Sequence, residues 1–264
     1  MELNIYQVDA FTDKLFGGNP AAVIPLNEWL SDEQLQSIAA ENNLSETAYY
    51  VPKGEAYELR WFTPAIEVDL CGHATLATAY VLFEIKKVNK PVLNFHSKSG
   101  MLSVTKNTRG YTLDFPVDEI KSSSKKSAVA EVLGIDEVIS CVEGRNVVLA
   151  EVASEKILQN LEPDFSKLAG LHRHGLIVTA KGDHVDYVCR CFFPNSGINE
   201  DPATGSAQTI LVPYWSKKTG LTEFSARQIS KRGASLFCKL NKDRVEISGQ
   251  AVLYMQGILQ PELS

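Results

Sequence analysis

Short apolar stretches with alternating polar positions recur along the chain and predict β-strands. In the first half they are Tyr57–Phe62, Val92–Phe95, Leu102–Thr105 and Tyr111–Phe115, and in the second half Val185–Phe192, Leu236–Leu240, Val245–Gly249 and Leu253–Leu259. After the first strand of each set comes a stretch with few charges, Gly72–Phe83 or Thr204–Tyr214, which predicts a helix buried nearly all round. Strands that wrap one buried helix, twice over, predict an α+β fold.

The two halves also match in sequence. Arg60–Pro64 resembles Arg190–Pro194, and Cys71 and Asp201 follow the two prolines at the same spacing. Further on, the tetrapeptides Ser-Lys-Ser-Gly and Ser-Lys-Arg-Gly, which end at Gly100 and Gly233, give a second match in the same order. Two ordered matches favour an internal duplication.

The duplication predicts two lobes. We place the N-terminal lobe at residues 1–117 and the C-terminal lobe at 118–264, with the last strand able to return to the N-terminal lobe. The Lys- and Ser-rich stretch Val117–Lys126 is the natural linker.

The loops before the two buried helices are candidates for anion binding. A helix N-terminus presents unpaired N–H groups at the positive end of a dipole, and two such ends facing a shared cleft would hold a small carboxylate. The groups expected to bind it lie near Gly72, His73, Thr204, Gly205 and Ser206. The alternative is that Thr75, Thr204 and Ser206 only cap the helices.

Glu46 is the candidate acid–base residue. It lies in the mostly apolar, strand-like stretch Leu44–Val51, after a predicted helix at Ser31–Glu41 with a capping box formed by Ser31 and Gln34. A carboxylate on the buried face of that strand would suit general acid–base catalysis. The alternative is an edge-strand glutamate that points into water.

Three residues at the helix openings have open roles. His73 either shuttles a proton or is a plain first-turn donor, and Asp201 either caps N–H groups or is a second acid, with Glu200 beside it. The helix N-terminus predicts a lowered pKa for the Cys71 thiol. Because residues so close in sequence rarely aim at one another, Cys71 and His73 are not expected to form a nucleophile–base pair.

Composition limits the remaining functions. A net charge of −6 argues against nucleic-acid binding, and the five cysteines follow no disulfide pattern and suit a reducing cytoplasm. The apolar runs are too short for a membrane span, and no signal peptide is recognised. Cys189 and Cys191 share a strand face but lack partner ligands, so no metal is expected, and no motif indicates an organic cofactor.

Four ordered motifs resemble the phenazine-biosynthesis (PhzF-like) family of the diaminopimelate epimerase-like superfamily. They span Asp9–Val23 (with Gly18-Asn-Pro), Ser45–Ala48, Cys71–Thr75 and Glu200–Ala207. The resemblance implies two pseudo-symmetric lobes, each a barrel-like, mostly antiparallel sheet around a central helix, with the site between them. It also implies a homodimer that needs no metal or cofactor.

By resemblance, the chain is a proton-transferring isomerase for a small carboxylated molecule. Glu46, His73 and Asp201 would be catalytic. The substrate would bind at Asn19, Ser45, Gly72, Thr204, Gly205 and Ser206. Two alternatives stay open at this stage, an epimerase that uses Cys71 and Asp201 as its bases, and a metabolite-binding protein without turnover.

Overall fold

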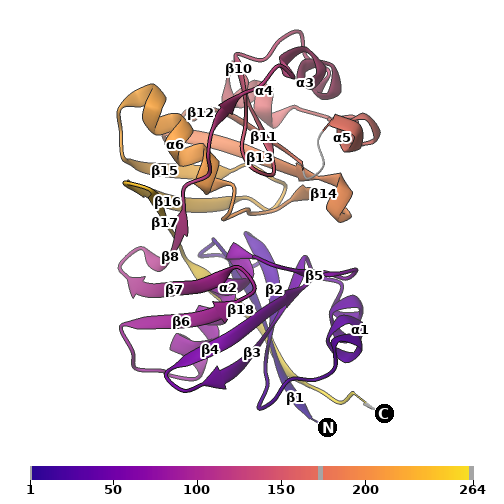
Figure 1. Ribbon diagram of the computed structural model, residues 1–264, viewed down its shortest axis with the longest axis vertical. Coiled ribbons are helices and arrows are strands. Elements are labelled where there is room, and N and C mark those ends of the chain that lie inside the picture. The colour runs from indigo at the N-terminus through magenta and orange to yellow at the C-terminus, as the bar shows by residue number, and fades with distance from the viewer. Residues whose placement is uncertain (1, 172–174, 262–264) are drawn as a thin grey trace. The chain divides into compact units, whose positions relative to one another are not determined.

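The computed structural model describes residues 2–171 and 175–261, which form two compact units. Unit 1 comprises the residues up to Asp114 and those from Ser248 onward, and unit 2 comprises Phe115–Ile247. The C-terminal lobe predicted at 118–264 therefore lacks its last strand. That strand, β18 (Ala251–Leu259), lies antiparallel beside β1 (Leu3–Ala10) of unit 1 (Figure 1).

Unit 1 is a curved sheet around one helix. Its elements are β1, β2 (Asn19–Pro25), α1 (Asp32–Asn42), β3 (Glu46–Lys53), β4 (Ala56–Phe62), β5 (Glu67–Val68), α2 (Gly72–Tyr80), a π-helical turn (Val81–Ile85), β6 (Val92–Ser97), β7 (Gly100–Asn107), β8 (Gly110–Pro116) and β18. Helix α2 packs on β1, β2, β3 and β18, and all of Gly72–Ala79 is buried, as the lack of charges predicted. Helix α1 covers the opposite face of β3 and begins with the predicted capping box of Ser31 and Gln34.

Unit 2 repeats this plan. Its elements are β9 (Lys121–Ser122), α3 (Lys126–Leu133), β10 (Ser140–Glu143), β11 (Val148–Glu151), α4 (Glu155–Gln159), α5 (Phe165–Leu171), β12 (Leu176–Lys181), β13 (Tyr187–Phe193), a 3₁₀ turn (Pro194–Ser196), β14 (Ile198–Asp201), α6 (Gln208–Thr219), β15 (Glu223–Gln228), β16 (Ala234–Asn241) and β17 (Arg244–Gly249). A core of aliphatic side chains lies under α3, α4 and α5.

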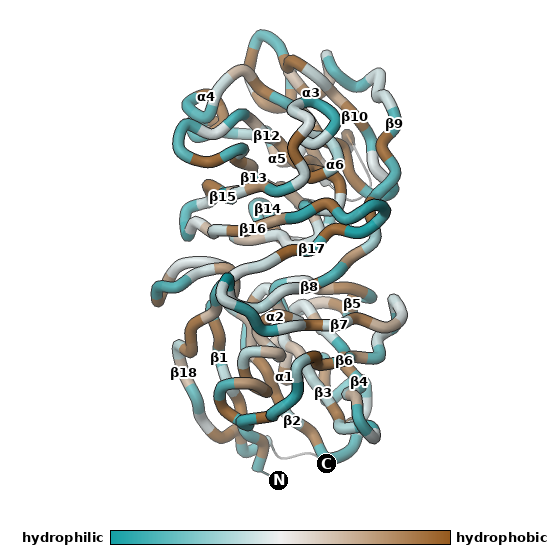
Figure 2. The backbone as a smooth tube through the Cα atoms, turned by 90° about the vertical axis from the view of Figure 1, so that its left-hand side faces the viewer, coloured by the Kyte–Doolittle hydropathy of each residue, from teal (hydrophilic) through white to brown (hydrophobic). Residues whose placement is uncertain are grey.

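Strand pairing confirms the duplication. Unit 1 runs β18-β1-β2-β3-β4-β6-β7 and unit 2 runs β9-β10-β11-β12-β13-β15-β16, with β5 and β14 paired to β4 and β13. Successive strands in the two orders pair in the same direction: wherever a pair is parallel in unit 1, the corresponding pair is parallel in unit 2, and the same holds for the antiparallel pairs. In both, a parallel pair next to antiparallel neighbours (β4 with β6, β13 with β15) frames the connection that contains the central helix. Hydrophobic and hydrophilic residues are interspersed along both units (Figure 2). Buried and exposed residues alternate in β16, whereas five of the six residues of β12 are buried.

An arginine clamp is duplicated as well. Arg60 binds both oxygens of Glu67 at 2.7 and 2.9 Å, and Arg190 binds both oxygens of Glu200 at the same two distances. Each guanidinium also lies 5.1 Å from the ring of the phenylalanine two residues later. Because Glu200 is held in this clamp, we assign it a structural role.

The start of α6 differs from the prediction. The helix was expected from Thr204 but begins at Gln208. The preceding residues form a tight turn, in which the N–H groups of Gln208 and Thr209 bind the carbonyls of Gly205 and Ser206. Among the described residues, no helix has the length and apolar character needed to cross a bilayer.

Candidate active site

Glu46 is the first residue of β3, an interior strand that pairs with β2 on one side and β4 on the other. Its side chain is only 14% exposed. The alternative of an edge-strand glutamate in water is therefore wrong. The carboxylate lies at the end of the sheet where the central helix begins.

His73 lies directly beside this carboxylate. It is the second residue of α2, its side chain is 5% exposed, and its Nε2 atom is 3.1 Å from Oε2 of Glu46. Burial alone would lower the pKa of His73, but the adjacent Cys71 and the Glu46 carboxylate raise it well above 6.5. The Nε2 atom of His73 thus lies within ion-pair distance of an acid, although the two atoms do not form a hydrogen bond. Its role as a proton shuttle stays a prediction.

Two side chains approach the other ring nitrogen of His73. Nδ2 of Asn19 lies 3.2 Å and Sγ of Cys71 lies 3.5 Å from Nδ1. The expectation that Cys71 and His73 do not aim at one another is wrong. Cys71 is the N-cap of α2 and has extended backbone angles (φ −143°, ψ 115°), so its side chain turns back along the first helical turn toward His73.

The predicted lowering of the Cys71 pKa is also wrong. Burial raises the pKa of this thiol to about 11, and the Glu46 carboxylate adds to the rise. The helix N-terminus and His73 do not compensate for the loss of water around the sulfur. Cys71 therefore carries its proton at neutral pH.

The position of Asn19 depends on the glycine before it. Gly18 has φ +58°, and a Cβ atom there would lie 2.0 Å from the carbonyl oxygen of Ala10. Only glycine fits this close approach of two backbone segments. This turn places Asn19 at the start of β2, where its side chain is fully buried and contacts His73. Its predicted place in substrate binding stays a prediction.

Asp201 and Thr204 form a separate polar cluster in unit 2. Oγ1 of Thr204 donates to Oδ2 of Asp201 at 2.5 Å. Gln228, fully buried at the end of β15, accepts from the Thr204 N–H at 2.8 Å and donates to the Asp201 carbonyl at 2.6 Å. The side chain of Gln228 thus pins both ends of the loop that carries Asp201.

The remaining predicted residues vary in exposure. Gly72 and Gly205 are buried, Ser45 is partly exposed and Ser206 is exposed. Thr75 is not an N-cap, because its hydroxyl donates to the Cys71 carbonyl at 2.5 Å. Unit 1 thus brings Asn19, Glu46 and His73 together, and unit 2 brings Asp201 and Thr204 together.

Two residues near these clusters were missed from the sequence. Gln228 sits in a polar stretch with no motif signal. Trp61 is 1% exposed, and its indole N–H has no hydrogen-bond partner among the described residues. It is directly opposite Ala48, so it shares the sheet face of Glu46. The aromatic residues of β4 gave no hint in the sequence that the indole donor would be left without a partner.

Glu46, Cys71 and His73 are the candidate metal ligands, since their ligand atoms lie within 4.8 Å of one another. A bound ion would need the thiolate, the carboxylate and one ring nitrogen to converge. Here the thiol lies at Nδ1 and the carboxylate at Nε2. All three groups lie close together, so the imidazole does not separate the thiol from the carboxylate.

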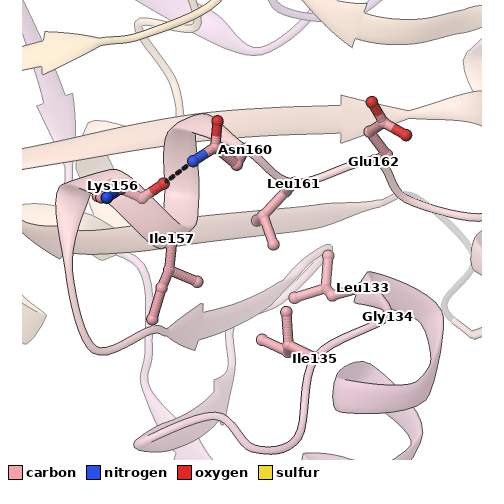
Figure 3. A pocket seen from close by; sticks show the side chains of 8 residues that line it. All are labelled: Leu133, Gly134, Ile135, Lys156, Ile157, Asn160, Leu161 and Glu162. Carbon is pink, nitrogen blue, oxygen red and sulfur yellow. Dashed lines mark hydrogen bonds between the residues drawn. The ribbon is translucent and has the colours of Figure 1, made fainter.

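A pocket of about 430 Å³ in unit 2 is unrelated to these residues. Its lining comes from Leu133–Ile135, Lys156–Ile157 and Asn160–Glu162, at the ends of α3 and α4 (Figure 3). Aliphatic side chains dominate, and Nδ2 of Asn160 donates to the Lys156 carbonyl. The pocket brings no group of acid–base residues together.

Comparison with known proteins agrees with this architecture. The sequence profile of the phenazine biosynthesis-like protein family matches residues 8–257. An uncharacterized isomerase of Pseudomonas aeruginosa is 50% identical over 259 residues, which cover 98% of this chain and 99% of that protein. A PhzF-family protein of Enterococcus faecalis has a solved structure with a TM-score of 0.93 and 46% identity, covering 99% of this chain and 100% of that one.

A more distant structure defines the fold. The hydroxyproline epimerase of Agrobacterium vitis superposes with a TM-score of 0.64 at 10% identity, covering 98% of this chain and 92% of that one. Together with the pairing order, this likeness identifies the diaminopimelate epimerase-like fold in both units.

Proposed function

Because the chain belongs to the phenazine biosynthesis-like protein family, whose relatives include proteins named as isomerases, we propose that it is an isomerase in which Glu46 moves a proton on a small carboxylated substrate. The carrying observation is the buried contact of 3.1 Å between the Glu46 carboxylate and the His73 imidazole.

The chemistry proposed for Glu46 is general acid–base catalysis. Its carboxylate accepts a proton from a substrate carbon and returns it at a neighbouring position, so no net charge or atom is lost. His73 holds the carboxylate in place and, as an imidazolium, stabilises its charge. The raised pKa of His73 supports this role, because the ring then keeps its second proton to higher pH.

A carboxylated substrate is proposed because of the start of α2. The N–H groups of its first turn lie at the positive end of the helix dipole, next to His73. The contributions of Asn19 and Ser45, and of Asp201, Thr204, Gly205 and Ser206 in unit 2, belong to the same proposal. So does the expectation of a homodimer in the cytoplasm.

The state of Cys71 bears on the epimerase alternative. A base at Cys71 would have to be a thiolate, and burial raises the pKa of this thiol to about 11. Forming that thiolate at pH 7 disfavours a thiol base by about four orders of magnitude. Glu46 is therefore the better base.

Exchange with heavy water tests the proposal. A panel of amino, cyclic imino and cyclic unsaturated carboxylic acids is incubated with the protein in D₂O, and deuterium uptake and isomer formation are followed by NMR and mass spectrometry. We expect Glu46→Gln to lower turnover by about 10²–10⁴-fold while the fold is kept. Glu55→Gln is the control, since this exposed acid pairs only with a lysine on the surface. Full activity of Glu46→Gln would remove Glu46 from the mechanism.

A further inference from the structure

Two polar atoms at this site have no hydrogen-bond partner in the part of the chain that the structure describes. They are Oε2 of Glu46 and Nε2 of His73, and both are buried. The two atoms lie 3.1 Å apart without forming a hydrogen bond, and the His73 side chain is only 5% exposed. Because a buried polar atom without a partner costs free energy, we expect a third atom to bind both of them.

The sulfur of Cys71 completes a set of three possible metal ligands. One ligand atom from each of Glu46, Cys71 and His73 lies within 4.8 Å of the other two. Zinc bonds of about 2.0–2.3 Å to oxygen, nitrogen and sulfur place the ligand atoms of a tetrahedral site about 3.3–3.7 Å apart. The three atoms are therefore within about 1 Å of the spacing that one zinc ion requires, a shift that small side-chain rotations provide.

Nε2 is the nitrogen of His73 that is available to an ion. Asn19 and Cys71 both contact the other nitrogen, Nδ1. When Nε2 binds a metal, Nδ1 carries the proton, and a half-turn of the Asn19 amide lets its oxygen accept from that N–H group. A histidine that binds zinc usually donates its other N–H in this way, so Asn19 supplies the outer contact that such a ligand needs.

The charge of the cluster suits a divalent cation. In the proposed function His73 is an imidazolium beside the Glu46 carboxylate, and the thiol of Cys71 is neutral, so the net charge is zero. As the Zn–N and Zn–S bonds form, the ring and the thiol each release one proton to water. Two positive charges leave and two arrive, so the buried cluster keeps its net charge, and no oxidant or reductant is needed.

We propose that Glu46, Cys71 and His73 form a zinc site, and that bound zinc inhibits the proposed reaction by occupying the carboxylate that moves the proton. A water molecule is the fourth ligand. A thiolate ligand selects zinc over magnesium and calcium, which prefer oxygen ligands. The inhibition rests on the proposed function, whereas the binding of zinc does not.

Cobalt(II) tests the site without a substrate. This ion binds where zinc does, and a bond between cobalt and a thiolate gives a charge-transfer band in the near ultraviolet. We expect the band in the wild type, its loss on addition of zinc chloride, and no loss in a large excess of magnesium chloride. Cys71→Ser should lack the band, and Cys141→Ser, which changes a partly buried cysteine of unit 2, should keep it.

Three results would overturn the zinc site. They are the absence of the band in the wild type, a band that persists in Cys71→Ser, and a band that magnesium removes as readily as zinc does.

The other two ligands are tested by the affinity for zinc, measured by competition with a coloured chelator. Glu46→Gln and His73→Gln should each weaken binding at least about 10-fold, because even the loss of an outer partner of a zinc ligand costs 10–100-fold. Glu55→Gln and His96→Gln, which change exposed residues of the same types, should leave the affinity unchanged. Urea unfolding curves show which variants keep the wild-type fold. Equal affinity in all folded variants would place the ion elsewhere.

Inhibition is measured with a substrate of the wild type. Zinc chloride should stop isomerisation over the concentrations at which it displaces cobalt, and a chelator should restore turnover. If the cobalt band appears but zinc leaves turnover intact, the inhibition is wrong. If no band appears while Glu46→Gln loses turnover, the zinc site is wrong and the proposed function stands. If the band appears and Glu46→Gln keeps turnover, the zinc site stands and the proposed function is wrong.

Discussion

Buried carboxamides contact the candidate acid–base residues of both units. Asn19 contacts His73 in unit 1, and Gln228 holds the loop of Asp201 and Thr204 in unit 2. Residue types and motifs in the sequence were sufficient to select Glu46, His73 and Asp201 as candidates. The contacts between them join residues up to 54 positions apart, and no local pattern encodes such distances.

The titration of His73 predicts how stability depends on pH. Its pKa is raised in the folded protein, so its contribution to stability is complete below the unfolded value of about 6.5 and is lost as pH rises through the higher folded value. Urea unfolding of the wild type should therefore show a falling free energy of unfolding from pH 6.5 upward. His73→Gln should lack this part of the slope, and parallel curves for the two proteins would contradict the shift.

At the scale of elements, sequence patterns predicted about half of the strands and both central helices. The strands predicted from Tyr57 to Leu259 all appear, most of them one or two residues longer. The start of α6 was placed four residues too early, because small residues before Gln208 look helical but form successive turns. The duplicated arginine was recognised as part of the repeat. Its partners Glu67 and Glu200 were not predicted, because they lie at different distances along the sequence from Arg60 and Arg190.

Loss of one arginine clamp should destabilise unit 2. In Arg190→Met the half-buried Glu200 loses both of its charged contacts, and the carbonyls of Leu158 and Leu161 lose their donor. We expect a loss of about 2–4 kcal/mol in the free energy of unfolding, measured by urea denaturation. Lys53→Met, which breaks an exposed pair with Glu58, should cost less than about 1 kcal/mol. Equal effects of the two would argue against a special role for the clamp.

The turn before β2 should tolerate only glycine. Gly18→Ala strains a left-handed backbone and brings Cβ against the Ala10 carbonyl, so we expect a cost of at least about 2 kcal/mol, seen in the thermal midpoint. Gly134→Ala is the matched control, since Gly134 has φ +66° but open space around it, and should cost about 1 kcal/mol. A similar loss of stability in both variants would show that backbone strain alone accounts for the cost, and that the contact with the Ala10 carbonyl adds nothing.

For the whole molecule, the internal repeat was the most informative signal. It predicted two units built on one plan, and the order of strand pairing is the same in both. The return of β18 was only one of the arrangements that the sequence allowed, because its apolar stretch would fit an edge of either unit. Pairing with β1 decides it, and that is a contact between opposite ends of the sequence.

The placement of β18 has a consequence for synthesis on the ribosome. Every strand of unit 2 precedes β18 in the chain, so the second unit has its full set of residues before the first one does. At about 5–20 residues per second, the open side of β1 waits on the order of ten seconds for its partner. During that interval the exposed edge of β1 can pair with a strand of another chain. This nascent form is therefore the one that a chaperone would protect most from aggregation.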